Sequence, residues 1–332
     1  MTAENHTQNL CTRRNLMVGS TLAIAGLAMP QIMTRAAQAE TPRASADAPG
    51  FRRIRIGDFE VVTLLDGKRA ADGPHPIFGA DQTPETVGAL LRENFLPENR
   101  FVTGFAPVLV NTGSDLVLFD TGFGADGRGN GLGQLEANLR AAGYTPDAIT
   151  IVVLTHLHGD HINGLTGGGN PSFPNARYVV GQIEYDFWTD SARAGTPAEN
   201  NAKAVQAKVV PFAEKTTFIK AGDNVVSGIT SIAAFGHTPG HLAFHLQSAG
   251  KQILLTADTA NHYVVSLQRP DWHVAYDIDK AQAAATRKKI FDRIATDRLP
   301  FIGYHFPFPS IGFVEKAETG YRYVPASYQF DL

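Results

Sequence analysis

An apolar segment that ends in a cluster of polar side chains is the feature that most limits how this sequence can fold. Residues 149–154 are expected to form a strand buried on both faces. They run directly into Thr155-His156-Leu157-His158-Gly159-Asp160-His161, where Gly159 is expected to relieve backbone strain. Imidazole and carboxylate groups bind zinc and related metals. The segment therefore predicts a metal site at the end of a buried strand.

Three further candidate ligands follow apolar runs in the same way. They are His237 after residues 229–235, Asp258 after residues 252–255, and His305 after residues 301–304. Loops that follow strands carry functional residues in layered α/β folds. These matching contexts argue against the alternative of a surface loop that is rich in histidine by chance.

The remaining histidines are expected not to bind metal. His241 fits a hydrogen-bonded structural histidine better than a direct ligand. The same expectation applies to His75, His245, His262 and His273. Of these, His262 lies only four residues after Asp258, so it is the one placed nearest the predicted site.

The chain alternates between strand-like and helical patterns from Phe51 onward. Strands are predicted at residues 59–65, 107–111, 116–119, 149–154, 229–235, 242–246 and 252–255, with a hairpin turn at 112–115. Helices are predicted at residues 134–142, ending at Gly143, and at 183–188, 198–213 and 279–294, the last with Asp279 as its N-cap. This order predicts one domain over residues 51–332, an α/β fold whose sheets are covered by helices on their outer faces.

The first residues predict export. Arg13 and Arg14 precede an apolar run at residues 16–29, which is shorter than the roughly 20 residues that span a bilayer. Ala37-Gln38-Ala39 then resembles a cleavage site. Residues 1–39 are therefore predicted to be a twin-arginine signal peptide and residues 40–50 a linker, which implies a periplasmic or secreted protein. An uncleaved anchor is the alternative.

Composition excludes several classes of function. Cys11, the only cysteine, lies before the arginine pair, so the mature protein has no thiolate nucleophile and no cysteine metal ligand. The net charge is -3 and no basic stripe stands out, which argues against nucleic acid as a partner. With 43% hydrophobic and 18% charged residues, the chain can bury a large core.

The histidine-rich segment and four others resemble the metallo-β-lactamase superfamily. His156, His158, Asp160 and His161 match its HxHxDH motif. The methyl parathion hydrolase branch is similar at Ala48-Pro49-Gly50-Phe51, Gly57-Asp58-Phe59-Glu60, Gly236-His237-Thr238-Pro239-Gly240-His241 and His305-Phe306-Pro307-Phe308-Pro309-Ser310-Ile311-Gly312. The resemblance covers nearly all of residues 50–332. It implies a four-layer αββα sandwich with the metals at one edge, and a homodimer.

The resemblance also implies a site for two divalent metal ions, with zinc expected and manganese, cobalt or iron as alternatives. The first metal would be held by His156, His158 and His237, the second by Asp160, His161 and His305, and Asp258 would bridge them. Asp120 and His241 would be hydrogen-bond partners of this set rather than ligands. Metals in such pairs are about 3.5–4 Å apart.

The activity implied is hydrolysis of small-molecule esters. Two metals that share a water lower its pKa from 15.7 towards about 7, so a bridging hydroxide would be the nucleophile. The expected substrates are phosphotriesters of the methyl parathion or paraoxon type, lactones and aryl esters. Asp160 and Asp258 are the catalytic carboxylates, and either could pass a proton to the leaving group. The alternatives are an acyl-homoserine lactonase, a thioesterase or β-lactamase, an iron-dependent oxidoreductase of the same fold, and a non-catalytic binding protein.

Aromatic residues are the candidates for the substrate pocket. They are Phe123, Phe173, Trp188, Phe306 and Phe308. One position departs from the family, because acyl-homoserine lactonases usually have a tyrosine three residues after the bridging aspartate, where this chain has Asn261. The methyl parathion hydrolase branch tends to have an apolar residue there. Asn261, His262 or Tyr263 could replace that tyrosine.

Overall fold

Neighbouring residues in the central strands face two different apolar cores, because side chains alternate between the faces of a sheet. In β6 (Leu116–Phe119), Val117 packs into one core and Leu118 into the other, and both are fully buried. In β7 (Ile151–Leu154), Val153 and Val152 divide in the same way. The predicted strand buried on both faces is confirmed, although it begins at Ile151 rather than at residue 149.

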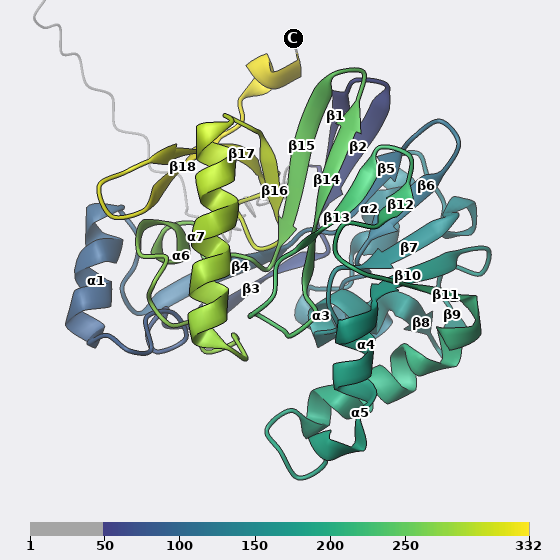
Figure 1. The fold of residues 1–332 in the computed structure, drawn as a ribbon, viewed down its shortest axis with the longest axis horizontal. Helices are drawn as coiled ribbons and strands as arrows, with labels where there is room; N and C mark the ends of the chain where they lie inside the picture. The colour runs from purple at the N-terminus through teal and green to yellow at the C-terminus, as the bar shows by residue number, and fades with distance from the viewer. Residues whose placement is uncertain (1–48, 332) are drawn as a thin grey trace, which may run out of the picture. The chain divides into compact units, whose positions relative to one another are not determined.

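The computed structural model describes residues 49–331, and its main elements are two seven-stranded mixed sheets (Figure 1). The first has the order β1 (Phe51–Ile56), β2 (Phe59–Leu64), β5 (Val108–Asn111), β6, β7, β10 (Arg177–Gly181) and β11 (Thr216–Ile219). The second has the order β12 (Asn224–Val226), β13 (Ile229–Ala233), β14 (Leu242–Ser248), β15 (Lys251–Ala257), β16 (Phe301–Gly303), β17 (Ile311–Lys316) and β18 (Tyr321–Pro325). β6, β7, β10 and β11 run parallel, as do β15 and β16.

The two sheets pack face to face through one shared core. Val110, Phe119 and Val153 from the first sheet meet Phe244 and Leu255 from the second in this core. The rings of Phe119 and Phe244 lie 5.0 Å apart between their centroids. The inner layer of the fold is therefore made of branched and aromatic side chains from both sheets.

Helices cover the outer face of each sheet. α2 (Leu135–Ala141), α4 (Gln182–Thr189) and α5 (Glu199–Lys208) contribute to the apolar core outside the first sheet. α7 (Lys280–Thr296) lies along the outer face of the second sheet (Figure 1) and buries Ile290, Phe291 and Ile294 there. The predicted four-layer αββα sandwich is confirmed.

Shorter elements complete the described chain. Two two-stranded sheets pair β3 (Gly67–Asp72) with β4 (Arg100–Phe105) and β8 (Thr166–Gly167) with β9 (Asn170–Pro171). The other α-helices are α1 (Pro84–Glu93), α3 (Gly159–Ile162) and α6 (Val265–Gln268). The 3-10 helices are η1 (Ala125–Asn130), η2 (Pro146–Ala148), η3 (Asn163–Leu165), η4 (Ser191–Arg193), η5 (Val210–Lys215) and η6 (Tyr328–Asp331).

One predicted helix is divided. The sequence pattern predicted a single helix over residues 198–213, but α5 ends at Lys208 and a 3-10 helix follows from Val210. Pro211 explains the break, because a proline has no backbone N–H and its ring clashes with the carbonyl four residues earlier. The two pieces therefore have different hydrogen bonding.

The predicted signal peptide, residues 1–39, lies outside the described residues, as does nearly all of the predicted linker, and both stay predictions. Between residues 49 and 331, no helix is both long and apolar enough to cross a bilayer. These residues belong to a single compact unit.

The N-terminus of α7 offers a test of this fold. Asp279 is the N-cap, as predicted, and its carboxylate accepts a hydrogen bond of 2.9 Å from the backbone N–H of Gln282. We expect Asp279→Ala to lower the free energy of unfolding by about 1 kcal/mol, measured by urea denaturation. Asp279→Ser should keep most of the stability, and equal losses in the two variants would contradict the cap.

Candidate metal centre

Four strand ends bring the candidate ligands to one edge of the sandwich. β7 leads into the loop that carries His156 and His158, and β13 leads into the loop that carries His237. β15 ends directly before Asp258, and β16 ends two residues before His305. Because β7 belongs to the first sheet and the other three strands to the second, the site exists only where the two sheets meet.

Three histidines form the first group of candidate ligands. His158 Nδ1 lies 3.1 Å from His156 Nε2 and 3.0 Å from His237 Nε2. Tetrahedral zinc with bonds of about 2.0–2.1 Å to nitrogen would hold its ligand nitrogens about 3.3 Å apart. The spacing of these nitrogens therefore suits three corners of a metal's coordination sphere.

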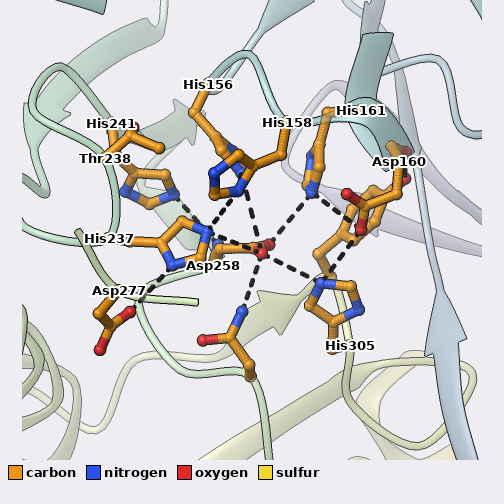
Figure 2. Close-up of polar contacts among 12 residues, drawn as sticks. His156, His158, Asp160, His161, His237, Thr238, His241, Asp258, Asp277 and His305 are labelled. Carbon is orange, nitrogen blue, oxygen red and sulfur yellow. Dashed lines mark hydrogen bonds and ion pairs between the residues drawn. The ribbon is translucent and has the colours of Figure 1, made fainter. Parts of the chain in front are cut away.

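A second group lies on the other side of Asp258, as Figure 2 shows. Asp160 Oδ2 is 3.6 Å from His161 Nε2 and 3.5 Å from His305 Nε2. Asp258 reaches both groups, with Oδ2 at 3.3 Å from His237 Nε2 and 3.1 Å from His305 Nε2, and Oδ1 at 3.4 Å from His161 Nε2. All seven candidate ligands are thus brought together, with one carboxylate between the two groups.

Three ligand histidines make hydrogen bonds through the ring nitrogen that points away from the cluster. These bonds show that the seven candidate ligands fit metal ions. His161 Nδ1 donates to Asp120, His237 Nδ1 to Asp277 and His305 Nδ1 to the carbonyl of Gly104, at 2.8, 2.9 and 3.0 Å. A neutral imidazole that donates through one nitrogen presents a lone pair at the other. When these rings are neutral, each inner nitrogen directs a lone pair at a carboxylate or at another lone pair, an arrangement that a cation stabilises.

Two buried atoms without partners support the same conclusion. In the described part of the chain, His161 Nε2 and Asp258 Oδ1 have no hydrogen-bond partner although both are buried. Buried polar atoms are nearly always satisfied. A metal ion bound to both atoms would satisfy them.

The pKa values of the histidines follow their surroundings. Burial and the neighbouring histidines hold the pKa values of His156 and His158 well below the usual value, so both rings are neutral donors. Burial also lowers the pKa of His237, but its hydrogen bonds to Asp258 and Asp277 outweigh this and raise it to about 9. Burial likewise opposes ionisation of Asp258, but His305 and His161 reverse the effect and hold its pKa well below 3.8.

Asp120 organises the histidine-rich loop from beneath. Its carboxylate accepts hydrogen bonds from the backbone N–H and the hydroxyl of Thr155, both at 2.9 Å, as well as from His161. Asp120 has a φ of 61° and Ala257, next to Asp258, has a φ of 43°. Such left-handed conformations are costly for residues other than glycine and cluster at functional sites.

The predicted strain relief at Gly159 is wrong, because that residue opens α3 with no positive φ.

His241 supports the backbone of Asp258. Its Nδ1 donates to the carbonyl of Ala234 at 2.9 Å, and its Nε2 accepts from the N–H of Asp258 at 3.1 Å. Burial and the nearby His237 lower its pKa to about 3, so the ring stays neutral. Both nitrogens are occupied, which leaves neither for a metal.

Sequence reasoning missed three buried residues around the ligands. Asp277 joins His237 to Arg287, whose guanidinium donates to it at 2.8 Å. Tyr304 stacks on His161, with ring centroids 4.0 Å apart. Glu184 is the third, and it lies beneath two ligand loops. The only sequence signal for Tyr304 was its position next to His305, and nothing in the sequence singled out Asp277.

Glu184 joins the two loops that supply the first group of ligands. Its carboxylate accepts hydrogen bonds from the N–H of Leu157 at 3.0 Å, the hydroxyl of Thr238 at 2.7 Å and the N–H of Gly240 at 2.9 Å. A fourth comes from the indole of Trp188 at 2.7 Å. Burial raises the pKa of this carboxyl, and the four donors oppose that shift. Glu184 thereby fixes the spacing of the two loops.

A cavity of ≈ 360 Å³ opens above the ligands. The residues that line it are Arg69, Ala71, Phe78, Phe101, Thr103, Phe105, Phe123, His158, Gly159, Asp160, Asn201, His237, Asp258, Asn261, Tyr276 and His305. The predicted pocket residues Phe123 and Asn261 are among them. Most of its aromatic wall comes from β4, which supplies Phe101 and Phe105, and from the segment between β3 and α1, which supplies Phe78. The sequence pattern predicted no pocket residues in these segments.

Three predicted pocket residues lie elsewhere. Trp188 is 2% exposed and packs beneath His158, held there by its bond to Glu184. Phe306 is fully buried in the core under α7. His262 lies behind Phe78, with ring centroids 5.2 Å apart. Of the more general aromatic candidates, Phe173 is buried outside the first sheet and Phe308 lines a different depression. None of these five side chains lines the cavity above the ligands.

We predict that Asp277 controls how tightly the site binds metal. Asp277→Asn leaves an amide group facing either His237 or Arg287, so one of its two hydrogen bonds is lost. Such changes reduce metal affinity by about 10- to 100-fold. Competition with a chromophoric zinc chelator measures this, and Asp271→Asn, at an exposed carboxylate paired with Lys288, should have no effect.

A second prediction concerns His262 and acid stability. Its Nδ1 accepts hydrogen bonds from the N–H groups of Val264 and Val265, and burial lowers its pKa to about 4. The unfolded chain, with a pKa of about 6.5, takes up this proton first as pH falls, so the free energy of unfolding should drop by about 2 kcal/mol between pH 7 and pH 5. His262→Gln should lose that part of the pH dependence in urea titrations. Identical pH dependence in both proteins would show that the ring does not stay neutral.

The comparisons with known proteins agree with this geometry. Residues 106–297, more than half of the chain, match the profile of the Metallo-beta-lactamase superfamily. AidC, described as a dizinc quorum-quenching lactonase in complex with the product N-hexanoyl-L-homoserine, is 28% identical, with a TM-score of 0.74 over 84% of this chain and 98% of AidC. AbOPH, described as a hydrolase in the beta lactamase superfamily, is 30% identical, with a TM-score of 0.79 over 85% of this chain and 99% of AbOPH.

Curated relatives match a shorter stretch. The N-acyl homoserine lactonase AttM of Agrobacterium fabrum is 30% identical over 127 residues, which is 37% of this chain and 45% of AttM. The N-acyl homoserine lactonase AiiA of Bacillus thuringiensis subsp. kurstaki is 27% identical over 123 residues, 37% of this chain and 43% of AiiA. Both alignments span less than half of the relative's length. From the superfamily profile and the similarity of AbOPH over nearly its whole length, the chain belongs to the metallo-beta-lactamase superfamily.

Proposed function

We propose that the protein is a binuclear metal hydrolase that opens lactone rings, with N-acyl homoserine lactones as its main substrates. The observation that carries this proposal is the pair of ligand groups that share Asp258 at the floor of a cavity. AidC, described as a dizinc lactonase, supports the choice of zinc, and AidC, AttM and AiiA together support the substrate class. The sequence pattern ranked phosphotriesters ahead of acyl-homoserine lactones, and these relatives reverse that order.

The metal ions and the residues around the cavity would have different roles in the reaction. Two zinc ions would polarise the lactone carbonyl and supply a water of lowered pKa as nucleophile. Both carboxylates line the cavity, but the side chain of Asp160 is 22% exposed, whereas that of Asp258 is only 3% exposed and is enclosed by the ligand histidines. Asp160 is therefore the carboxylate that can reach the leaving oxygen, and we assign it the transfer of the proton.

The shape and lining of the cavity suit an apolar ester. Its volume of ≈ 360 Å³ is within the range of about 300–1,000 Å³ that small-molecule sites occupy. Phe78, Phe101, Phe105 and Phe123 supply apolar walls for an acyl chain. Asn261 donates through its amide to Asp258 at 2.8 Å, so this amide steadies the carboxylate instead of replacing the hydroxyl of the lactonase tyrosine.

Hydrolysis of phosphotriesters and aryl esters is the second candidate function. The aromatic walls would also hold an aryl leaving group, and the sequence resembles the methyl parathion hydrolase branch. AbOPH is described only as a hydrolase and does not separate the two candidates.

The test is a substrate panel on zinc-loaded protein. We expect the highest kcat/KM on N-hexanoyl-homoserine lactone, with lower values on dihydrocoumarin, phenyl acetate, paraoxon and methyl parathion. Asp258→Ala should reduce every activity by more than about 100-fold, because it removes the shared carboxylate, while Asp271→Ala should not change any of them. Elemental analysis should find about two zinc ions per chain. Coloured protein that contains iron and hydrolyses no ester would instead support an oxidoreductase.

A further inference from the structure

One face of the two-stranded β3–β4 sheet forms a wall of the cavity. In this antiparallel pair Arg69 lies opposite Thr103, Ala71 opposite Phe101 and Gly67 opposite Phe105. Alternate residues of a strand share a face, and Arg69, Ala71, Phe101, Thr103 and Phe105 all line the cavity. The wall is apolar except for Thr103 and the one cation, Arg69.

The guanidinium of Arg69 is held by aromatic rings rather than by a carboxylate. Its Cζ lies 5.6 Å from the ring centroid of Phe105 and 5.9 Å from that of Phe123. Cation–π contacts at such distances hold a guanidinium over a ring while leaving its N–H groups available. Within residues 49–331, Arg69 has no carboxylate partner and no hydrogen-bond acceptor. Its donors therefore face the cavity without a protein partner.

Arg69 lies just beyond the metal ligands. The ring of Phe105, which contacts Arg69, also contacts the ring of His305, with centroids 5.3 Å apart. Thr103, opposite Arg69, has its hydroxyl 3.4 Å from His305 Nδ1. A substrate whose scissile carbonyl lies at the ligands would thus bring its nearest substituents to the guanidinium.

We propose that Arg69 determines specificity by donating hydrogen bonds to the carbonyl oxygen of the acylamino group in N-acyl lactones. This inference rests on the proposed lactonase function and deepens it. The acylamino group sits on the carbon next to the lactone carbonyl, so its oxygen is available a few bonds from the metals. A negatively charged substituent suits the site less well, because Asp160 lines the same cavity. Simple alkyl lactones offer Arg69 no second acceptor.

The size of the effect follows from the type of bond. A hydrogen bond that involves a charged group contributes about 1.5–3 kcal/mol. This corresponds to about a 10- to 100-fold change in binding. Because the contact is remote from the bond that breaks, the change should appear in KM rather than in kcat.

The experiment compares two lactones that differ in the amide. Zinc-loaded wild type, Arg69→Met and Arg69→Lys are assayed on N-hexanoyl-homoserine lactone and on γ-nonalactone, which has an alkyl chain and no amide. We expect Arg69→Met to raise KM for the first by about tenfold or more, with kcat and the KM for γ-nonalactone within about twofold of wild type. Arg69→Lys should recover part of the loss. Arg100→Met, on the face of β4 that points away from the cavity, is the matched control and should behave as wild type.

Two outcomes would overturn the assignment of Arg69 and leave the lactonase function standing. In one, Arg69→Met impairs both lactones equally, which means that Arg69 only supports Phe105 and Phe123. In the other, KM is unchanged but inhibition by the product N-hexanoyl-homoserine weakens, which means that the guanidinium binds the product carboxylate. Wild-type protein that opens neither lactone would instead refute the proposed function itself, and the inference with it.

Discussion

Five imidazoles and two carboxylates direct their inner atoms at a space only a few ångströms across, and the rest of the described structure serves to hold them there. Without a cation, their lone pairs and charges would repel one another. The distances of 3.0 and 3.1 Å between nitrogens of His158 and its two neighbours, and the partnerless Nε2 of His161, are the direct signs of this constraint. A chain that keeps such a cluster must hold each ring by hydrogen bonds or packing on the side that faces away from the cluster.

The anchors come from different layers of the sandwich. Asp120, at the end of β6, holds His161, while Asp277 holds His237 and is itself neutralised by Arg287 of α7. Glu184, at the start of α4, ties the loop of His158 to the loop of His237. These carboxylates are buried, so removing a donor leaves an uncompensated charge in a medium of low dielectric constant. The metal site and the packing of the helices are therefore coupled.

The substrate wall has a different origin from the metal site. The cluster depends on strand ends and buried carboxylates, whereas much of the cavity wall comes from the paired strands β3 and β4 and from the segment between β3 and α1. Such connecting segments tolerate substitution better than buried ligands do. The fold can thus keep one reaction while the β3–β4 pair, through residues such as Arg69, sets the substrates that fit.

The sequence alone determined the layered α/β fold and brought the seven candidate ligands to notice, because both depend on local patterns. Buried strands are read from apolar runs such as residues 149–154, and ligands stand directly after them. The sequence could not identify Asp277 or Glu184, because each is far along the chain from its hydrogen-bond partner. Asp277 is 40 residues from His237, and Glu184 is 27 residues from Leu157. It also placed Trp188, His262 and Phe306 at the pocket. Whether these side chains face the cavity or the core depends on the direction of the backbone that carries them. Tertiary structure made those decisions, because hydrogen bonds between distant loops and the face on which a side chain lies depend on how the two sheets pack, and no short segment encodes that packing.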